Sequence, residues 1–158
     1  MTDISHPHDR VVRHALSDPR AATELLQQHL PQDLQNVIDL SSLKPQPDTF
    51  VDESLKMHCT DALFSVDINS HAGYLYVLLE HASTPKKLIP LYLHECMLKI
   101  MKHHVKKKEA IPLIYPLVLY NGNKKYNQPT DLRDLISAPK ELIDKYLCDA
   151  DIAFFDHN

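Results

Sequence analysis

The sequence predicts an α/β fold of mixed α+β type, in which helices flank a central mixed β-sheet. Three observations predict it. Residues 60–68 and 73–82 have the composition of two strands joined by turn-forming residues. A helix-period apolar stripe follows and extends to about residue 107. Residues 112–120 then form another strongly apolar run that is typical of a buried strand.

Length and composition indicate a single domain of 158 residues. We expect N-terminal helices over residues 1–40, a core with hairpin, long helix and strand over 49–122, and a small C-terminal part over 129–158. No run of about 18 apolar residues predicts a transmembrane helix, and the N-terminus lacks the charged and apolar regions of a signal peptide. A cytoplasmic protein without membrane association is therefore expected.

Helix signals open the chain. Residues 8–16 favour a short helix. Asp18 followed by Pro19 is typical of a helix start, because a carboxylate caps free amides and proline fits the first turn. Pro31 ends this second helix and is expected to open another short one that reaches Ile38.

The next segment is expected to be extended. The prolines within residues 44–48 disfavour helix for the residues before them and predict a connector. Residues 49–52 predict a short strand, and residues 52–56 a turn or a single helical turn. The hairpin follows, with residues 69–73 as its linker. Both alternating sets of side chains in residues 74–79 are apolar or aromatic, which predicts a central strand covered on both sides.

The C-terminal part contains weaker signals. Asn121-Gly122, directly after the apolar run, is the strongest tight-turn signal in the chain. Residues 129–147 predict a helical region that begins at Thr130 or Asp131. Residues 151–155 predict a last short strand.

A long helix is expected between the hairpin and the last apolar run, from near Lys86 or Pro90 to about Lys107. The net charge is −4, yet the first 80 residues are acidic and the remainder is basic. The densest positive run lies in this helix and contains Lys99, Lys102, Lys106, Lys107 and Lys108. Two interpretations stay open: a solvated helix end, where lysines suit the helix dipole, or a patch that contacts phosphates.

Two carboxylates belong to the predicted hairpin. Side chains alternate between the faces of a strand, so Asp61 and Glu80 can share one face, and in a hairpin centred near residue 71 Asp61 falls roughly opposite Glu80 or Ala82. Two carboxylates at that separation suit a hard cation such as Mg²⁺, which can activate water and polarise a phosphoryl oxygen. The alternative is a pair of exposed surface acids.

Cysteine and histidine give weaker signals. Cys59, Cys96 and Cys148 have no CxxC spacing and are expected to be reduced thiols. A histidine-based metal protein is a further hypothesis, although none of the histidines has HExxH or Cys/His ligand spacing. Those considered for it are His6, His8, His103, His104 and His157.

Several stretches resemble the Rpn family of recombination-promoting nucleases, a transposase-like family within the PD-(D/E)xK nuclease superfamily. The match covers nearly the whole chain in the family's order, and the LLEH segment followed by PLVLY makes it specific. The matching stretches are residues 8–11, 16–22, 50–55 and 60–66, GYLYVLLEHAS at 73–83, and PLVLYNG at 116–122. The resemblance implies a restriction-endonuclease-like core.

The resemblance also implies site residues. Asp61 takes the place of the motif aspartate and Glu80 that of the second acid. The position of the superfamily lysine is usually glutamine in this family, and in this chain it is Ala82. Alanine has no group to position water or contact phosphate. Lys86 or Lys87, just beyond, is a candidate substitute.

Two further acids match family positions. Asp52 is either a capping or turn residue or another acid near the metal. Asp9 is either a helix N-terminal acid or a residue that borders the site. The family commonly continues into further helices, whereas this chain stops at Asn158, as a short member, a decayed copy or a trimmed piece would.

Together these observations predict a metal-dependent DNA endonuclease that hydrolyses phosphodiester bonds, associated by resemblance with DNA recombination or transposase-like activity. Asp61 and Glu80 are expected to bind Mg²⁺, or another divalent cation such as Mn²⁺ or Ca²⁺. DNA is the expected partner, a homodimer stays open, and no organic cofactor is expected. The alternative is a catalytically impaired DNA- or protein-binding member of the same fold, because the third motif position is Ala82.

Overall fold

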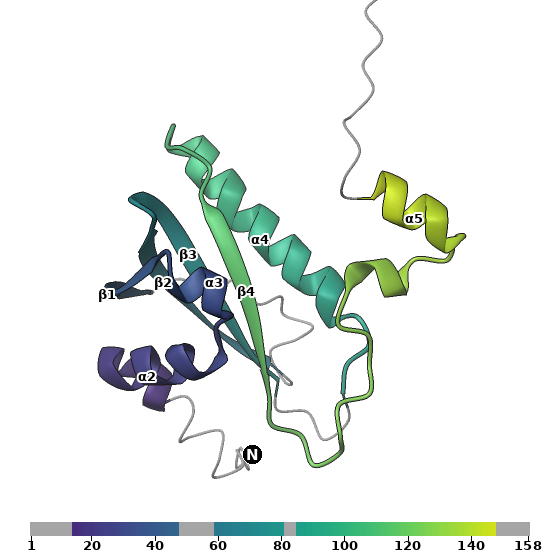
Figure 1. Cartoon of the computed structure of the whole chain (residues 1–158), viewed down its shortest axis with the longest axis horizontal. Helices are drawn as coiled ribbons and strands as arrows, with labels where there is room; N and C mark the ends of the chain where they lie inside the picture. The colour runs from purple at the N-terminus through teal and green to yellow at the C-terminus, as the bar shows by residue number, and fades with distance from the viewer. Residues whose placement is uncertain (1–13, 48–58, 81–84, 148–158) are drawn as a thin grey trace, which may run out of the picture.

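A four-stranded mixed sheet organises the structure, a computed structural model that describes residues 14–47, 59–80 and 85–147 (Figure 1). The strand order is β1-β2-β3-β4. The strands are β1 (Ile38–Gln46), β2 (Cys59–Ile68), β3 (His71–Glu80) and β4 (Leu113–Tyr120). The pairs β1–β2 and β2–β3 are antiparallel, and β4 pairs with β3 in parallel. The prediction of a mixed sheet flanked by helices is therefore confirmed.

The sheet is covered on both faces. On one face α2 (Pro19–His29) and the short α3 (Gln32–Gln35) pack near β1, and one hydrophobic cluster includes Leu26, Phe64 and Val77. On the other face α4 (Ile89–Lys106) contributes Leu93, Cys96 and Ile100 to a second cluster with residues of β2, β3 and β4. Strand β3 is buried from Leu75 to Glu80, as a central strand should be.

The helix signals proved accurate where the structure describes them. Residues 14–17, the described end of the first expected helix, are helical. The Asp18 carboxylate accepts a hydrogen bond from the backbone N–H of Arg20 at 3.1 Å, and Pro19 begins α2. Helix α4 begins and ends within a few residues of the expected limits because its apolar residues repeat at helical spacing against the sheet.

Strand β1 was not predicted. The N-terminal helices are expected to extend to residue 40 and the short one to reach Ile38, but α3 ends at Gln35 and β1 begins at Ile38. Residues 44–46 of β1 belong to the expected extended connector. The pairing of β1 with β2 shifts register between Asp39 and Lys44, so the apolar residues of β1 do not alternate regularly. Pro45 is tolerated because β1 lies at the edge of the sheet, where one side of the strand needs no amide donors.

The hairpin turn is tighter than the predicted linker. Asn69 and Ser70 both have positive φ, 48° and 66°, and Ile68 pairs directly with His71. Asn121-Gly122, in contrast, does not form a tight hairpin turn, and no described glycine has a positive φ. Gly122 instead allows a close approach, because a Cβ there would lie 2.1 Å from the Tyr120 hydroxyl oxygen.

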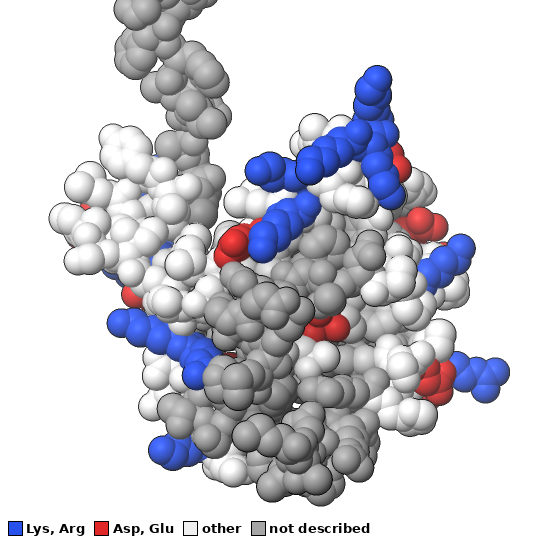
Figure 2. All heavy atoms as spheres, turned by 180° about the vertical axis from the view of Figure 1, so that it is seen from behind, with Lys and Arg blue, Asp and Glu red and all other residues white. Residues whose placement is uncertain are grey.

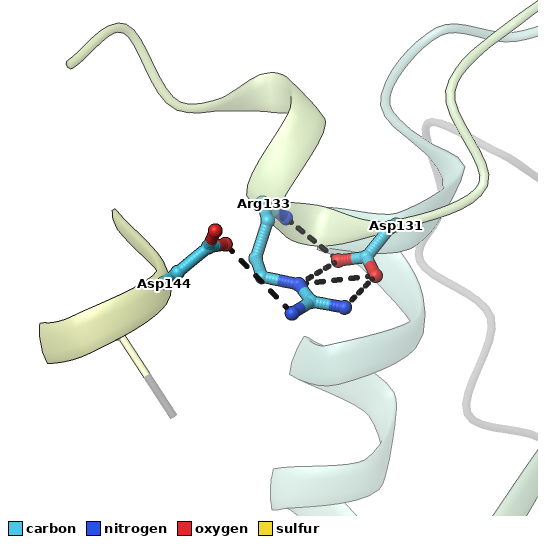
Figure 3. A network of polar contacts seen from close by, with 3 residues as sticks. All are labelled: Asp131, Arg133 and Asp144. Atoms are coloured by element: carbon cyan, nitrogen blue, oxygen red, sulfur yellow. Dashed lines mark hydrogen bonds and ion pairs between the residues drawn. The ribbon is translucent and has the colours of Figure 1, made fainter. Parts of the chain in front are cut away.

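The weak helical region splits into two pieces, η2 (Leu132–Leu135) and α5 (Lys140–Tyr146). The Arg133 guanidinium binds both carboxylate oxygens of Asp131 and lies 3.9 Å from Asp144 of α5 (Figure 3). The hydrogen bonds from Arg133 lower the pKa of the Asp131 carboxyl to about 2. The pieces are separate because Ile136 and Pro139 have extended backbone.

None of the helices in the described part of the chain has the length and apolar character needed to cross a membrane. The predicted elements over 49–52, 52–56 and 151–155 lie outside the described residues.

Candidate functional site

Asp61 and Glu80 lie on the face of the sheet that α4 covers. In the β2–β3 ladder Asp61 is opposite Leu78, and Glu80 is opposite Cys59. The prediction that Asp61 faces Glu80 or Ala82 is therefore wrong by at least two positions, because the turn contains two residues instead of five. A shift of two residues keeps the same face. The two carboxylates are diagonal neighbours, whose Cα atoms are typically about 7–8 Å apart.

Glu80 is the buried member of the pair, with no exposed surface. Its Oε1 accepts a hydrogen bond of 2.7 Å from the backbone N–H of Lys86. Its Oε2 is buried and has no hydrogen-bond partner among the described residues. Burial raises the pKa of Glu80, while the amide and the charge of Lys86 oppose that rise.

Asp61 is the more accessible member. It is half-buried and lines a pocket of about 330 Å³ beside Pro47 and Ser17. The buried hydroxyl of Tyr76 donates a hydrogen bond of 2.9 Å to Oδ2 of Asp61. The Cys96 thiol of α4 is in hydrogen-bonding contact with the same hydroxyl. Tyr76 therefore fixes the orientation of Asp61, and burial followed by the Asp61 charge raises the pKa of Tyr76.

Cys59 lies among these groups. Burial raises the pKa of the Cys59 thiol to about 12, with a further contribution from the charge of Glu80 and a smaller one from Asp61. The charge of Lys86 acts in the opposite direction. Cys59 and Cys96 are both outside any disulfide, which confirms the expectation of reduced thiols for the two described cysteines.

Lys86 and Lys87 occupy different surroundings. Lys86 is half-buried. Its backbone N–H donates a hydrogen bond to Glu80, and its positive charge opposes the rise in the Glu80 pKa. Lys87 is exposed. Of the two substitutes considered for the lysine of the superfamily motif, Lys86 is therefore the one that lies near the carboxylate pair.

The lysine run lies at the other end of the sheet from Glu80. Near the C-terminal end of α4, the ring of His104 contacts that of Tyr74, with ring centroids 5.2 Å apart. At the N-terminal end of α4, Ile89 lines the same pocket as Tyr120, which pairs with Glu80 in the sheet. Tyr74 and Glu80 are six residues apart, about 20 Å along a strand. Figure 2 shows basic side chains gathered over the C-terminal end of α4.

The individual lysines of the run also differ. Lys99 pairs with Glu95 at 3.5 Å, while Lys102, Lys106, Lys107 and Lys108 are exposed. The last four lysines thus form one exposed basic surface, while the charge of Lys99 acts on Cys96 near the Tyr76 hydroxyl.

Three sequence-predicted site residues, Asp9, Asp52 and Ala82, lie outside the described residues. Within residues 14–47, 59–80 and 85–147, no three His, Cys, Asp or Glu side chains form a group that could hold a metal ion. For the described histidines this argues against a histidine-based metal centre, and His104 instead pairs with Glu109 at 2.8 Å.

Sequence reasoning missed three residues of the site: Tyr76, Cys59 and Cys96. Tyr76 falls on the same alternating face of β3 as Glu80, and Cys59 on the same face of β2 as Asp61, so strand periodicity could have found both. Cys96 lies in the apolar stripe of α4, where nothing in the sequence distinguishes it from a core residue.

Comparison with known proteins gives one family match. The model of the family described as "Putative transposase, YhgA-like" matches residues 6–158. No solved structure matches the chain.

Three similar proteins come from Escherichia coli. Recombination-promoting nuclease RpnD of strain O157:H7 is 32% identical over 153 residues, which cover 89% of this chain and 59% of the relative. Recombination-promoting nuclease RpnC of strain K12 is 35% identical over 117 residues, which cover 73% and 39%. Inactive recombination-promoting nuclease-like protein RpnE of strain K12 is 33% identical over 119 residues, which cover 75% and 40%. The matches thus span between 39% and 59% of the length of these relatives.

Proposed function

This chain belongs to the YhgA-like transposase family, and from that membership we propose that it is a metal-dependent DNA endonuclease that hydrolyses phosphodiester bonds during recombination. Two of the similar proteins are named recombination-promoting nucleases. One observation supports the assignment above all: Asp61 and Glu80, the two acids of the motif, share one face of adjacent strands.

The donor atoms of the pair fit a divalent cation. Carboxylate oxygens are the ligands that Mg²⁺, Mn²⁺ and Ca²⁺ prefer. Oε2 of Glu80 is buried without a partner among the described residues, so it can accept a ligand at little cost in existing hydrogen bonds. Asp61 and Glu80 would hold the cation, which when bound activates water and polarises a phosphoryl oxygen.

The other residues of the site have supporting roles. Tyr76 holds Asp61 in place, and the Lys86 amide holds Glu80. The Lys86 ammonium group, whose charge acts on Glu80, is a candidate to contact a scissile phosphate in the role that Ala82 cannot fill. The exposed lysines at the C-terminal end of α4 and just after it would contact the DNA backbone beyond the cleavage point.

A second candidate function is a catalytically impaired DNA- or protein-binding member of the same family. Ala82 favours it, because alanine has no polar group at the third motif position. One of the similar proteins is named an inactive recombination-promoting nuclease-like protein, which supports this candidate.

Plasmid cleavage tests the first candidate. Wild type, Asp61→Ala and the matched control Asp67→Ala, from an exposed position of the same strand face, are incubated with Mg²⁺, Mn²⁺, Ca²⁺ or EDTA. We expect cleavage that requires a divalent cation, falls at least about a hundred-fold in Asp61→Ala and persists in Asp67→Ala. An unchanged rate in Asp61→Ala would contradict the assignment of this site.

The variant Ala82→Gln separates the two candidates. If the missing polar group limits the chemistry, Ala82→Gln cleaves faster than wild type. If wild type already cleaves at a rate that the variant does not improve, the impaired alternative is wrong.

A further inference from the structure

A second pocket lies beside Glu80 and takes no part in the function proposed above. Its volume is about 370 Å³, at the lower end of the roughly 300–1,000 Å³ typical of ligand sites. The first turns of α4, the end of β4 and the loop over residues 121–130 form its walls. The side chains that line it are mainly apolar or aromatic and include Ile89, Leu93, Val118, Tyr120 and Tyr126.

The pocket is on the same sheet face as Glu80. Tyr120 is the ladder partner of Glu80, and paired residues of neighbouring strands point to the same face. The backbone N–H of Asn121 donates to the carbonyl of Glu80 at 2.9 Å, which joins the start of the loop to the end of β3. The charge of Glu80 reaches Tyr126, whose pKa is raised by burial first and then by this carboxylate.

Two tyrosine rings form one wall of the pocket. The rings of Tyr120 and Tyr126 are 5.1 Å apart with an angle of 66° between their planes. The Tyr120 hydroxyl donates a hydrogen bond of 2.6 Å to the carbonyl of Lys124, so the loop holds this ring in place. Gly122 makes the arrangement possible, because any side chain there would collide with the Tyr120 ring.

Polar groups at the rim suit a nucleotide. The Pro90 carbonyl can only accept, so Nδ1 of His94, 2.7 Å away, carries the hydrogen of that bond. Nε2 is the ring nitrogen that this bond leaves for a hydrogen bond to a base. Lys124 and Lys125 are exposed on the loop, and Lys86 lies near Glu80, where each can contact a phosphate.

We propose that this pocket binds one unpaired nucleobase of the DNA substrate, stacked against Tyr126 beside the scissile phosphate. Aromatic stacking accepts any base, because every base has a π face. A paired base is inaccessible inside the duplex and would have to leave the stack first. The enzyme would therefore favour single strands or unpaired positions over intact duplex. This inference rests on the proposed function, because it takes DNA as the substrate of the Asp61–Glu80 site.

Binding without catalysis tests the pocket separately from the cleavage site. Fluorescence anisotropy in EDTA measures the affinity of the full chain for a single-stranded oligonucleotide and for a hairpin duplex of the same length. The variants are Tyr126→Ala, which removes the ring, and Tyr126→Phe, which keeps it. The control is Tyr146→Ala, at an exposed tyrosine of α5 outside the pocket. Oligonucleotides with 5-iodouracil then report by photo-crosslinking which tyrosine contacts the base.

We expect tighter binding of the single strand than of the duplex. Tyr126→Ala should weaken single-strand binding about five-fold or more, while Tyr126→Phe and Tyr146→Ala bind like wild type. The crosslink should map to Tyr126 or Tyr120. Equal single-strand affinity in wild type and Tyr126→Ala, with DNA still bound, would overturn the base pocket alone. Failure of wild type to bind either DNA in EDTA would also overturn the base pocket, while the proposed function is decided separately by the cation-dependent plasmid cleavage.

Discussion

The backbone N–H of Lys86 donates a hydrogen bond of 2.7 Å to Oε1 of Glu80, while the other oxygen of this fully buried carboxylate has no partner among the described residues. Within the described part of the chain, hydrogen bonds thus satisfy only one of the two carboxylate oxygens. An ionised group in that state destabilises the fold until another ligand, such as a cation, reaches its second oxygen.

The variant Glu80→Gln should be more stable than wild type in EDTA at pH 8, by on the order of 1 kcal/mol, because an amide keeps the acceptor for Lys86 and carries no buried charge. Burial raises the pKa of Glu80 above its ordinary value of 4.5. The folded state therefore binds the proton more tightly, and wild-type stability is lost as the pH rises from about 4.5 through the raised pKa. Urea denaturation at pH 4 and pH 8 measures this, and the difference should shrink at pH 4.

Saturating Mg²⁺ should reverse the order at pH 8, since only wild type keeps both carboxylates. At a hundred times the Kd a cation adds about 2.7 kcal/mol to the free energy of unfolding. The exposed position Glu24 of α2 supplies the control Glu24→Gln. A Glu80→Gln variant that is less stable than wild type at pH 8 in EDTA would contradict the account of the buried charge.

The variant Tyr76→Phe should lower metal affinity and cleavage rate by about 10- to 100-fold, because the hydroxyl that orients Asp61 is removed. Isothermal titration with Mn²⁺ gives the affinity, and plasmid cleavage gives the rate. Tyr74→Phe is the matched control, two residues earlier on the same face of β3. Equal Mn²⁺ affinity in wild type and Tyr76→Phe would remove Tyr76 from the site.

The double variant Lys106→Gln/Lys107→Gln should weaken DNA binding and flatten its salt dependence. For duplex DNA, the slope of log K against log salt falls in magnitude by about 0.9 for each phosphate that the protein no longer neutralises. Both lysines are exposed and follow His104, which contacts Tyr74 at the end of β3 away from Glu80, so Mn²⁺ affinity should not change. Lys140→Gln/Lys145→Gln in α5 is the control. An unchanged slope would favour the interpretation of the run as a solvated helix end.

Cys59 should resist alkylation in the folded protein. The residue is 2% exposed, and its pKa is raised from 9.0 to about 12, so the thiolate fraction at pH 8 is about a thousand-fold below that of a free thiol. Iodoacetamide labelling followed by peptide mass spectrometry measures each cysteine separately. In urea Cys59 should label fully. Labelling of the folded protein at the rate of a free thiol would contradict the burial of this face.

Local sequence patterns determined the central elements of the fold. The apolar residues on both faces of β3 require cover on both sides, and the helical spacing in α4 leaves a single face for the sheet. The shared face of Asp61 and Glu80 could also be predicted, because side chains alternate with a period of two and an error of two residues in register does not change the face.

Only the tertiary structure decided the features that depend on contacts between distant residues. β1 forms because β2 offers it an unpaired edge, although its own sequence alternates poorly and contains Pro45. Asn121-Gly122 makes no hairpin because β4 ends the described sheet and no described strand returns beside it. The bond from Lys86 to Glu80, the contact of Tyr76 with Asp61 and the distance of the lysine run from the carboxylates follow from strand register and helix packing. These contacts join different parts of the fold, so no local sequence pattern predicts them.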